Sequence, residues 1–192
     1  KIKSFSIKDN NADIFISDIE VNIEEINNHL QKINGTTAYI NFKDGNIKKK
    51  IILNDVLGEA IFYSLLPSIL IAEELNIDIN KAIFDIEGAE RTKGRMRILN
   101  GIFNSNIIDD THNYSQNALQ NGINLIKNIK MKSKKIFVIG DMLELGDYTK
   151  REHEKAGKDI ATVTDILITS GIRSKILGES AINSGMNKEN VF

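Results

Sequence analysis

Three stretches of the sequence hold side chains that could do chemistry on a charged small molecule. The longest, residues 134–155, reads KKIFVIGDMLELGDYTKREHEK and places Asp141, Glu144 and Asp147 directly after an apolar run. If that run is a strand, the three carboxylates lie at its carboxyl end, where ligands collect in open α/β sheets. They could then receive an ammonium group or a magnesium ion. The alternative is local, because acidic residues also favour the start of a helix.

The two shorter stretches combine acidic and basic groups. In IIDDTHN, residues 107–113, Asp109 and Asp110 end an apolar run in the way that nucleotide sites place a carboxylate for a ribose hydroxyl or a metal-bound water. Paired aspartates after a strand are also common, so a structural role stays open. Arg95 follows the hinge residue Gly94 and could swing toward phosphate oxygens, although hinge arginines are more often plain surface residues.

Two further features have weaker chemical signals. His153 lies on the inward stripe of a predicted helix, so it is either a catalytic histidine or a packed, hydrogen-bonded one. The segment Asn34-Gly35-Thr36-Thr37 is the nearest approach to a glycine-rich phosphate loop, but no lysine follows it in register. It therefore fails the Walker pattern.

Strictly alternating strands and helices must position the residues after Gly94. The apolar run at 136–139 suits a strand buried on both faces of a parallel sheet, and the helical period after it places His153 and Gly157 on one face. The predicted strands are residues 96–99, 106–109, 136–139 and 165–169, with another starting at 190, and the predicted helices are residues 115–129 and a segment from 149. Asn100-Gly101 predicts a tight turn between the first two strands.

The first half of the chain has a different pattern, with short apolar groups separated by turn signals, Asn34-Gly35 among them, which predict small strands and hairpins. Apolar spacing predicts helices at 19–33, 59–75 and 79–86. We expect Pro67 to kink the second helix and Asn80 to be a possible cap of the third. The polar segment EGAERTKG predicts a domain boundary, so that residues 1–93 and 94–192 form separate domains.

Composition limits the possible partners. The charges nearly cancel, at 25 basic against 26 acidic residues, and no basic cluster alternates with aromatics, so we expect a small-molecule partner rather than nucleic acid. The absence of cysteine excludes disulfides and fits a reducing compartment. No apolar run approaches the roughly 20 residues that cross a bilayer, and KIKSFSIKDN has no signal-peptide core. We expect a cytoplasmic monomer without membrane insertion, and we read the start as cut rather than processed.

Taken together, GRM at residues 94–96, IIDDTHN at 107–113 and KKIFVIGDMLELGDYTKREHEKAG at 134–157 resemble the Mur ligases. GDMLELG with its following histidine is the specific part. Within the family the pattern is most similar to the type that adds D-alanyl-D-alanine to a UDP-N-acetylmuramoyl tripeptide. The resemblance covers residues 94–175 well and the preceding half more loosely, as the end of the family's central domain.

The resemblance implies an α/β fold: a Rossmann-like C-terminal domain with a mostly parallel sheet, truncated in this chain, preceded by the strand-and-helix end of a central ATPase-type domain. It implies a ligase of peptidoglycan precursor synthesis, in which ATP and Mg²⁺ serve to phosphorylate a carboxylate and an amine then attacks the acyl phosphate. The family's phosphate loop and its magnesium-binding lysine lie upstream, so we expect no catalysis by this chain alone.

The resemblance also implies roles for single residues, without naming a catalytic residue or a metal ligand. Arg95, Asp110 and Asn113 match the family's nucleotide-binding positions. Asp141, Glu144 and His153 match the loop and helix that shape the acceptor side.

Departures from the family pattern keep other functions open. Ala60 and Ile61 stand where the family has a histidine beside the adenine, His112 where a tyrosine is usual, and Gln116 where a proline is usual. One alternative is a non-catalytic nucleotide- or peptide-binding domain that kept the ligase fold. Another is a related ligase that adds amino acids to a different acceptor, such as glutamate to folates. A GKT or GKS phosphate loop upstream would favour the ligase.

Overall fold

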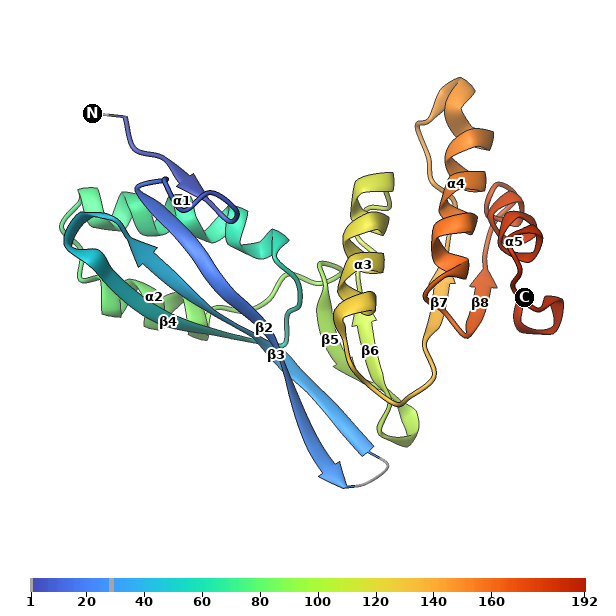
Figure 1. The fold of residues 1–192 in the computed structure, drawn as a ribbon, viewed down its shortest axis with the longest axis horizontal. Helices are drawn as coiled ribbons and strands as arrows, with labels where there is room; N and C mark the ends of the chain where they lie inside the picture. The colour runs from blue at the N-terminus through green and yellow to red at the C-terminus, as the bar shows by residue number, and fades with distance from the viewer. Residues whose placement is uncertain (1, 28–29) are drawn as a thin grey trace. The chain divides into compact units, whose positions relative to one another are not determined.

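The computed structural model describes residues 2–27 and 30–192, and the contacts divide the chain into two compact units, Lys1–Asp110 and Thr111–Phe192 (Figure 1). This division falls after Asp110 and not between residues 93 and 94. The domain boundary predicted from the sequence stays a prediction. None of the helices within the described ranges is long and apolar enough to cross a membrane.

The first unit is built on a four-stranded sheet in the order β1-β2-β3-β4. The first pair of strands is parallel and the other two pairs are antiparallel. The strands are β1 (Phe5–Ser6), β2 (Ile14–Asn27), β3 (Leu30–Phe42) and β4 (Ile47–Asn54). Alternate residues of β3, such as Ala38 and Ile40, are buried because successive side chains of a strand point to opposite faces. They pack against Phe62 and Leu66 of α1 (Ala60–Glu74) and Ile83 of α2 (Ile79–Gly88).

The helix predicted at residues 19–33 is wrong, because these residues belong to the long β2–β3 hairpin; residues 28 and 29 lie outside the described residues. Isoleucines spaced three and four apart mimic a helical stripe, but their branched Cβ atoms also favour strands, and cross-strand pairing such as Ile23 with Ile33 decided the outcome. Figure 1 shows that the end of the hairpin where β2 finishes and β3 begins extends past α1 and α2.

The predicted turn at Asn34-Gly35 is also wrong. Asn22 pairs with Gly35 and Ile23 with Ile33, so Asn34 is the extra residue of a β-bulge inside β3. Gly35 has φ 151°, and a Cβ there would overlap the carbonyl oxygen of Leu53 on β4. The glycine therefore marks a close approach of two strands rather than a chain reversal.

Both later helices of this unit match their predicted positions. Pro67 lies inside α1, and the kink expected there stays a prediction. The cap of α2 differs from the expected Asn80: the carboxylate of Asp78 accepts hydrogen bonds from the backbone N–H of Asn80 and of Lys81, at 2.7 and 3.4 Å. Asp78 precedes the first helical residue, where a side-chain oxygen can reach the unpaired amides of the first turn.

Replacing Asp78 by alanine should lower the free energy of unfolding by about 1 kcal/mol, since two amides lose their acceptor. Asn80→Ala is the matched control and should cost less than about 0.5 kcal/mol, because Asn80 contributes only its backbone N–H to the cap. Urea denaturation followed by circular dichroism measures both. A larger loss for Asn80→Ala than for Asp78→Ala would contradict the cap.

A short hairpin ends the first unit. Strands β5 (Arg97–Asn100) and β6 (Asn106–Asp109) pair antiparallel, with Ile98 opposite Ile108. This antiparallel pairing departs from the mostly parallel sheet that the resemblance implied for residues 94–192. The tight turn predicted at Asn100-Gly101 is instead a longer connection containing a 3₁₀ turn, Ile102–Asn104. The side chain of Asn106 ties the hairpin to β3, because it accepts from the N–H of Ile33 and donates to the carbonyl of Gln31.

The second unit contains the predicted parallel pair, β7 (Ile136–Ile139) and β8 (Ile166–Thr169), with Ile136 opposite Ile166. A single parallel bridge from Leu167 to Val191 begins the last predicted strand. Three helices, α3 (Gln116–Asn128), α4 (Thr149–Ala161) and α5 (Ser174–Asn183), complete the alternation of strands and helices. The buried core residues come from α3, α4, β8, α5 and the loop after β7: Leu119, Ile123, Met142, Ala156, Ile160, Leu167, Leu177 and Ala181.

The prediction that β7 is buried on both faces is wrong for the described structure. Phe137 and Ile139 pack against the core, whereas Ile136 and Val138 are 54% and 67% exposed. Alternate side chains of a strand point to opposite faces, and within residues 111–192 the helical core contacts only one of them.

Candidate functional site

The segment at residues 94–96, predicted to be a hinge, is held by Asp109, which ends β6, and by Asp110, which follows it. The backbone N–H of Gly94 donates to Oδ2 of Asp109 at 3.1 Å, and the N–H of Met96 donates to Oδ1 of Asp110 at 3.2 Å. Gly94 and Met96 both have positive φ, 69° and 50°. The two shorter stretches predicted from the sequence therefore meet, because the antiparallel pairing of β5 with β6 brings the aspartates back to residues 94–96.

Asp110 is half-buried, and burial raises the pKa of its carboxyl group above the ordinary value. The hydrogen bond from Met96 and the positive charge of Arg95 oppose this increase in pKa, and the negative charge of Asp109 adds to it. A carboxyl group in this state gains from any further donor or cation placed beside it.

Arg95 contributes an exposed guanidinium next to this carboxyl group. Within the described ranges its side chain makes no hydrogen bond and no ion pair, although its charge acts on Asp110. A guanidinium offers donors in a planar fork that suits phosphate oxygens. Arg95 is therefore placed to bind an anion without first breaking an internal contact.

The stretch from the end of β6 to the first residue of α3 contains the predicted Asn113 and two polar side chains, Tyr114 and Gln116, that were not predicted as site residues. Asn113 is exposed, as a nucleotide-binding residue would be. The Tyr114 hydroxyl and both amide atoms of Gln116 are buried without a hydrogen-bond partner in the described structure, and burial raises the pKa of Tyr114. Buried polar groups are normally paired, so these atoms could accept a bound polar molecule. Only the departure of Gln116 from the family's proline hinted at them.

A second cluster surrounds the loop after β7, and His153 lies at its centre. The backbone N–H of Met142 donates to Nε2 of His153 at 3.1 Å, and Nδ1 of His153 lies 2.7 Å from the carbonyl oxygen of Thr149. The His153 side chain is fully buried. The structure thus brings the histidine and the acidic loop together, through a backbone amide rather than a carboxylate.

Asp141 connects the same loop to the start of α5. Its Oδ1 accepts the backbone N–H of Ser174 at 2.7 Å, and the guanidinium of Arg173 lies 3.8 Å from Oδ2. Burial pushes the pKa of Asp141 upward, but the hydrogen bonds from Ser174 and Arg173 and the charge of Arg173 together bring it below the ordinary value. Asp141 is therefore an ionised group with its partners already in place.

Glu144 differs from Asp141 in being exposed. It has φ 61°, the left-handed conformation that side chains rarely adopt, and Gly146 follows with φ 51°. Its carboxylate makes no hydrogen bond or ion pair with the residues that the structure describes. Of the three site residues predicted on this side, Glu144 is the one whose charged group can meet a ligand directly.

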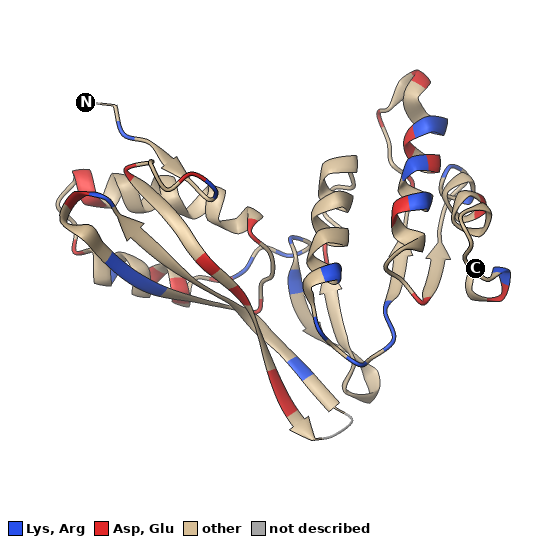
Figure 2. Cartoon of the chain, viewed as in Figure 1, with Lys and Arg blue, Asp and Glu red and all other residues tan. Residues whose placement is uncertain are grey.

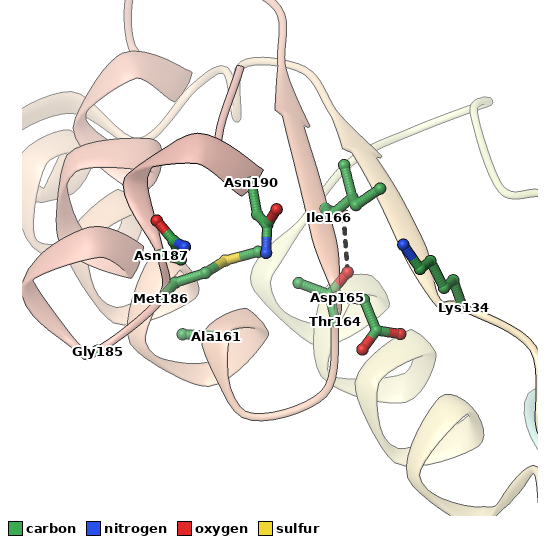
Figure 3. Close-up of a pocket in the computed structure, with 9 residues that line it drawn as sticks. All are labelled: Lys134, Ala161, Thr164, Asp165, Ile166, Gly185, Met186, Asn187 and Asn190. Atoms are coloured by element: carbon green, nitrogen blue, oxygen red, sulfur yellow. Dashed lines mark hydrogen bonds between the residues drawn. The ribbon is translucent and has the colours of Figure 1, made fainter.

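Charge and cavities complete the description of the second unit. Basic and acidic side chains alternate along α4, which gives it a mixed surface (Figure 2). Residues 2–27 and 30–192 contain no group of three or more histidine or carboxylate side chains that could hold a metal ion. A cavity of about 350 Å³ lies beside Lys134, Asp165 and Asn190, and among its lining residues the Thr164 hydroxyl donates to the Ile166 carbonyl (Figure 3). Lys134 and Asp165 precede β7 and β8, so this cavity is at the strand ends opposite to Asp141.

Comparison with protein families gives a match over residues 94–190 to the family described as Mur ligase, glutamate ligase domain. Two curated relatives are each named UDP-N-acetylmuramoyl-tripeptide–D-alanyl-D-alanine ligase. The Bacillus subtilis protein is 27% identical over 128 residues, 66% of this chain and 28% of the relative. The Buchnera aphidicola protein is 29% identical over 160 residues, 83% of this chain and 31% of the relative. The chain therefore spans about three tenths of the length of the curated relatives it matches.

Solved structures agree on the fold. MurF from Acinetobacter baumannii matches with a TM-score of 0.76 at 20% identity, covering 100% of this chain and 37% of that protein. MurF from Thermotoga maritima, solved in complex with ADP, matches with a TM-score of 0.71 at 20% identity over 98% of this chain and 43% of that one. The UDP-N-acetylmuramate–alanine ligase MurC from the same organism matches with a TM-score of 0.73 at 14% identity over 99% and 38%.

Proposed function

Since the chain belongs to the Mur ligase family, we propose that it is part of an ATP-dependent amide ligase that joins D-alanyl-D-alanine to a UDP-N-acetylmuramoyl peptide. The observation that carries the proposal is the exposed guanidinium of Arg95, between two backbone amides held by Asp109 and Asp110 and inside the segment that matches the family. The names of the curated relatives support the choice of amine. The fold alone does not support it, because MurC, an alanine ligase by name, has a similar fold.

The proposed reaction makes an amide from a carboxylate in two steps. Transfer of the γ-phosphoryl group from ATP to a carboxylate oxygen converts a poor electrophile into an acyl phosphate, with ADP as the leaving group. The amine nitrogen then attacks the acyl carbon, the C–O bond to phosphate breaks, and the nitrogen loses a proton. Negative charge develops on the transferring group and on the departing phosphate, so cations aimed at those positions lower the barrier.

In this proposal Arg95 neutralises charge on the phosphoryl group, while Asp110 and Asn113 hold the nucleotide. The proposal keeps Gly94 as the predicted hinge, where a change in the backbone dihedral angles would move the guanidinium of Arg95. The relative solved with ADP supports a nucleotide-binding role for this fold. Asp110 is suited to hydrogen-bond a ribose hydroxyl, since burial raises its pKa and a further donor would stabilise its charged form.

The acceptor site in this proposal is the loop after β7. Glu144 would pair with the ammonium group of the incoming dipeptide, because its carboxylate is exposed and the loop lies at the carboxyl end of a parallel strand. Asp141 and His153 belong to the same site. Mg²⁺ accompanies ATP in the proposal, and we assign it no ligand among the described residues.

The wider setting follows from the substrates. We propose a role in peptidoglycan precursor synthesis, and through it in cell-wall biogenesis, cell shape and division, with the enzyme acting as a cytoplasmic monomer. Residues 1–93 would be the C-terminal part of the family's central domain, and residues 94–192 would be its C-terminal domain.

A phosphate-release assay on the full-length parent tests this function. Phosphate should be released from ATP only when a UDP-muramoyl peptide and D-alanyl-D-alanine are both present, and omission of either substrate is the control. Release with glutamate in place of the dipeptide would overturn the substrate assignment in favour of a related ligase. ATP binding without release under every combination would overturn the ligase in favour of a binding domain.

A further inference from the structure

We infer that His153 is a positioning residue: a neutral imidazole with its proton on Nδ1 that fixes the loop after β7 and so sets where Glu144 stands. The tautomer and the loop geometry follow from the second unit alone. Only the identity of the molecule that Glu144 meets rests on the proposed function.

The tautomer follows from the chemistry of the two partners. A backbone N–H can only donate, so the Nε2 atom that accepts from Met142 at 3.1 Å must keep its lone pair. A carbonyl oxygen can only accept, so the Nδ1 atom 2.7 Å from Thr149 must carry the proton. Both ring nitrogens are then satisfied, and protonation of Nε2 would place two N–H groups against each other.

Burial argues against direct contact between His153 and a substrate. The side chain is 0% exposed, and its helical neighbours on the inward face, Ala156 and Gly157, are buried with it. Neither ring nitrogen is available to an incoming group without the loss of an existing hydrogen bond. The effect of His153 on a substrate must therefore pass through Met142.

The start of the loop, residues 141 and 142, is also restrained through Asp141. Its carboxylate binds the N–H of Ser174, and a Cβ on Gly171 would overlap that carboxylate. Residues 141 and 142 are thus held from α4 on one side and from the start of α5 on the other. Between Met142 and Thr149 the backbone turns outward through Glu144, in a left-handed conformation that costs about 1 kcal/mol and persists only where the surroundings fix it.

Nitrogen-15 spectra of the histidine rings in the 192-residue chain test the tautomer directly. The sequence holds three histidines, and His153→Gln identifies the signals of this one by removing them. We expect an unprotonated Nε2 and a protonated Nδ1 at neutral pH, together with slow hydrogen exchange at the Met142 amide. An Nε2–H tautomer, a charged ring, or fast exchange of Met142 would overturn the inference. This test requires no enzymatic activity.

Kinetics of the full-length parent then separate positioning from simple stabilisation. Leucine at 153 leaves the Met142 amide without an acceptor, whereas the amide oxygen of glutamine reaches about as far as Nε2 and can replace it. We expect His153→Leu to raise the KM for D-alanyl-D-alanine about tenfold with the KM for ATP unchanged, and His153→Gln to return it to within about threefold of the parent value.

The controls distinguish the possible failures. Glu144→Gln should raise the same KM while leaving the His153 ring signals unchanged, as expected if Glu144 makes the contact and His153 does not. Equal effects of leucine and glutamine, or parallel changes in both KM values, would overturn the positioning role. If His153→Leu does not fold, the glutamine variant and the ring spectra decide. A parent without ligase activity would count against the proposed function, and the ring spectra would still decide the tautomer.

Discussion

Arg95→Ala in the full-length enzyme should lower turnover by about a hundredfold or more, while the free energy of unfolding changes by less than about 0.5 kcal/mol. The expected loss of turnover is large because one cation aimed at a transferring phosphoryl group acts where charge develops. The expected loss of stability is small because the side chain is exposed and has no hydrogen-bond partner in the described structure. Steady-state phosphate release and urea denaturation measure the two quantities on the same preparations.

Arg91 is the matched control for Arg95, because it lies four residues away and has the opposite environment. Its guanidinium donates to three backbone carbonyl oxygens, those of Asn54, Ile86 and Glu87. Arg91→Ala should therefore cost about 1–3 kcal/mol of stability with little effect on turnover per folded molecule. If Arg95→Ala lost stability and turnover in equal measure, Arg95 would be structural and the phosphoryl-transfer role would fall.

The variant Arg95→Lys tests whether the charge or the planar shape of the guanidinium matters for turnover. A lysine keeps the positive charge but loses the planar fork that binds two phosphate oxygens at once. We expect Arg95→Lys to recover part of the turnover that alanine removes. Full recovery would mean that charge alone suffices, which would point to a longer-range electrostatic role for Arg95.

The second half of the chain could be predicted well from its sequence because its elements are short and locally determined. An apolar run such as Ile136–Ile139 followed by a loop and a helical stripe predicts strand, loop and helix from neighbouring residues alone. The β2–β3 hairpin could not be predicted this way. Its isoleucine spacing fits both periods, and only cross-strand pairing, such as that of Ile23 with Ile33, selects the strand.

The candidate site could also be predicted only in part. The sequence supplied the residue types, and the resemblance to a family supplied their roles, but neither predicted the hydrogen bonds that hold them. Asp110 binds an amide 14 residues earlier, His153 one 11 residues earlier and Asp141 one 33 residues later. Such partners depend on how strands and helices return past one another, so sequence spacing alone does not specify them.

Gly157→Ala in α4 should lower the free energy of unfolding of the second unit by about 3 kcal/mol, although alanine favours helices by about 1 kcal/mol over glycine. A Cβ at this position would overlap the carbonyl oxygen of Leu177 and crowd Ser180 on α5. The backbones cannot yield locally, because the Ser180 hydroxyl donates to the carbonyl of Glu154 at 2.6 Å and so holds the two helices together.

Gly178 on α5 provides the control, because it has the same residue type, is also helical and has room beside it. A Cβ there would lie 3.4 Å from the nearest atoms, the methyl groups of Thr169 and Val191, which is ordinary van der Waals contact. Gly178→Ala should therefore be neutral or stabilise the unit by up to about 1 kcal/mol, through helix propensity alone. Urea denaturation followed by far-ultraviolet circular dichroism compares the two variants. If Gly157→Ala were as stable as Gly178→Ala, α4 and α5 would not be in backbone contact at this position.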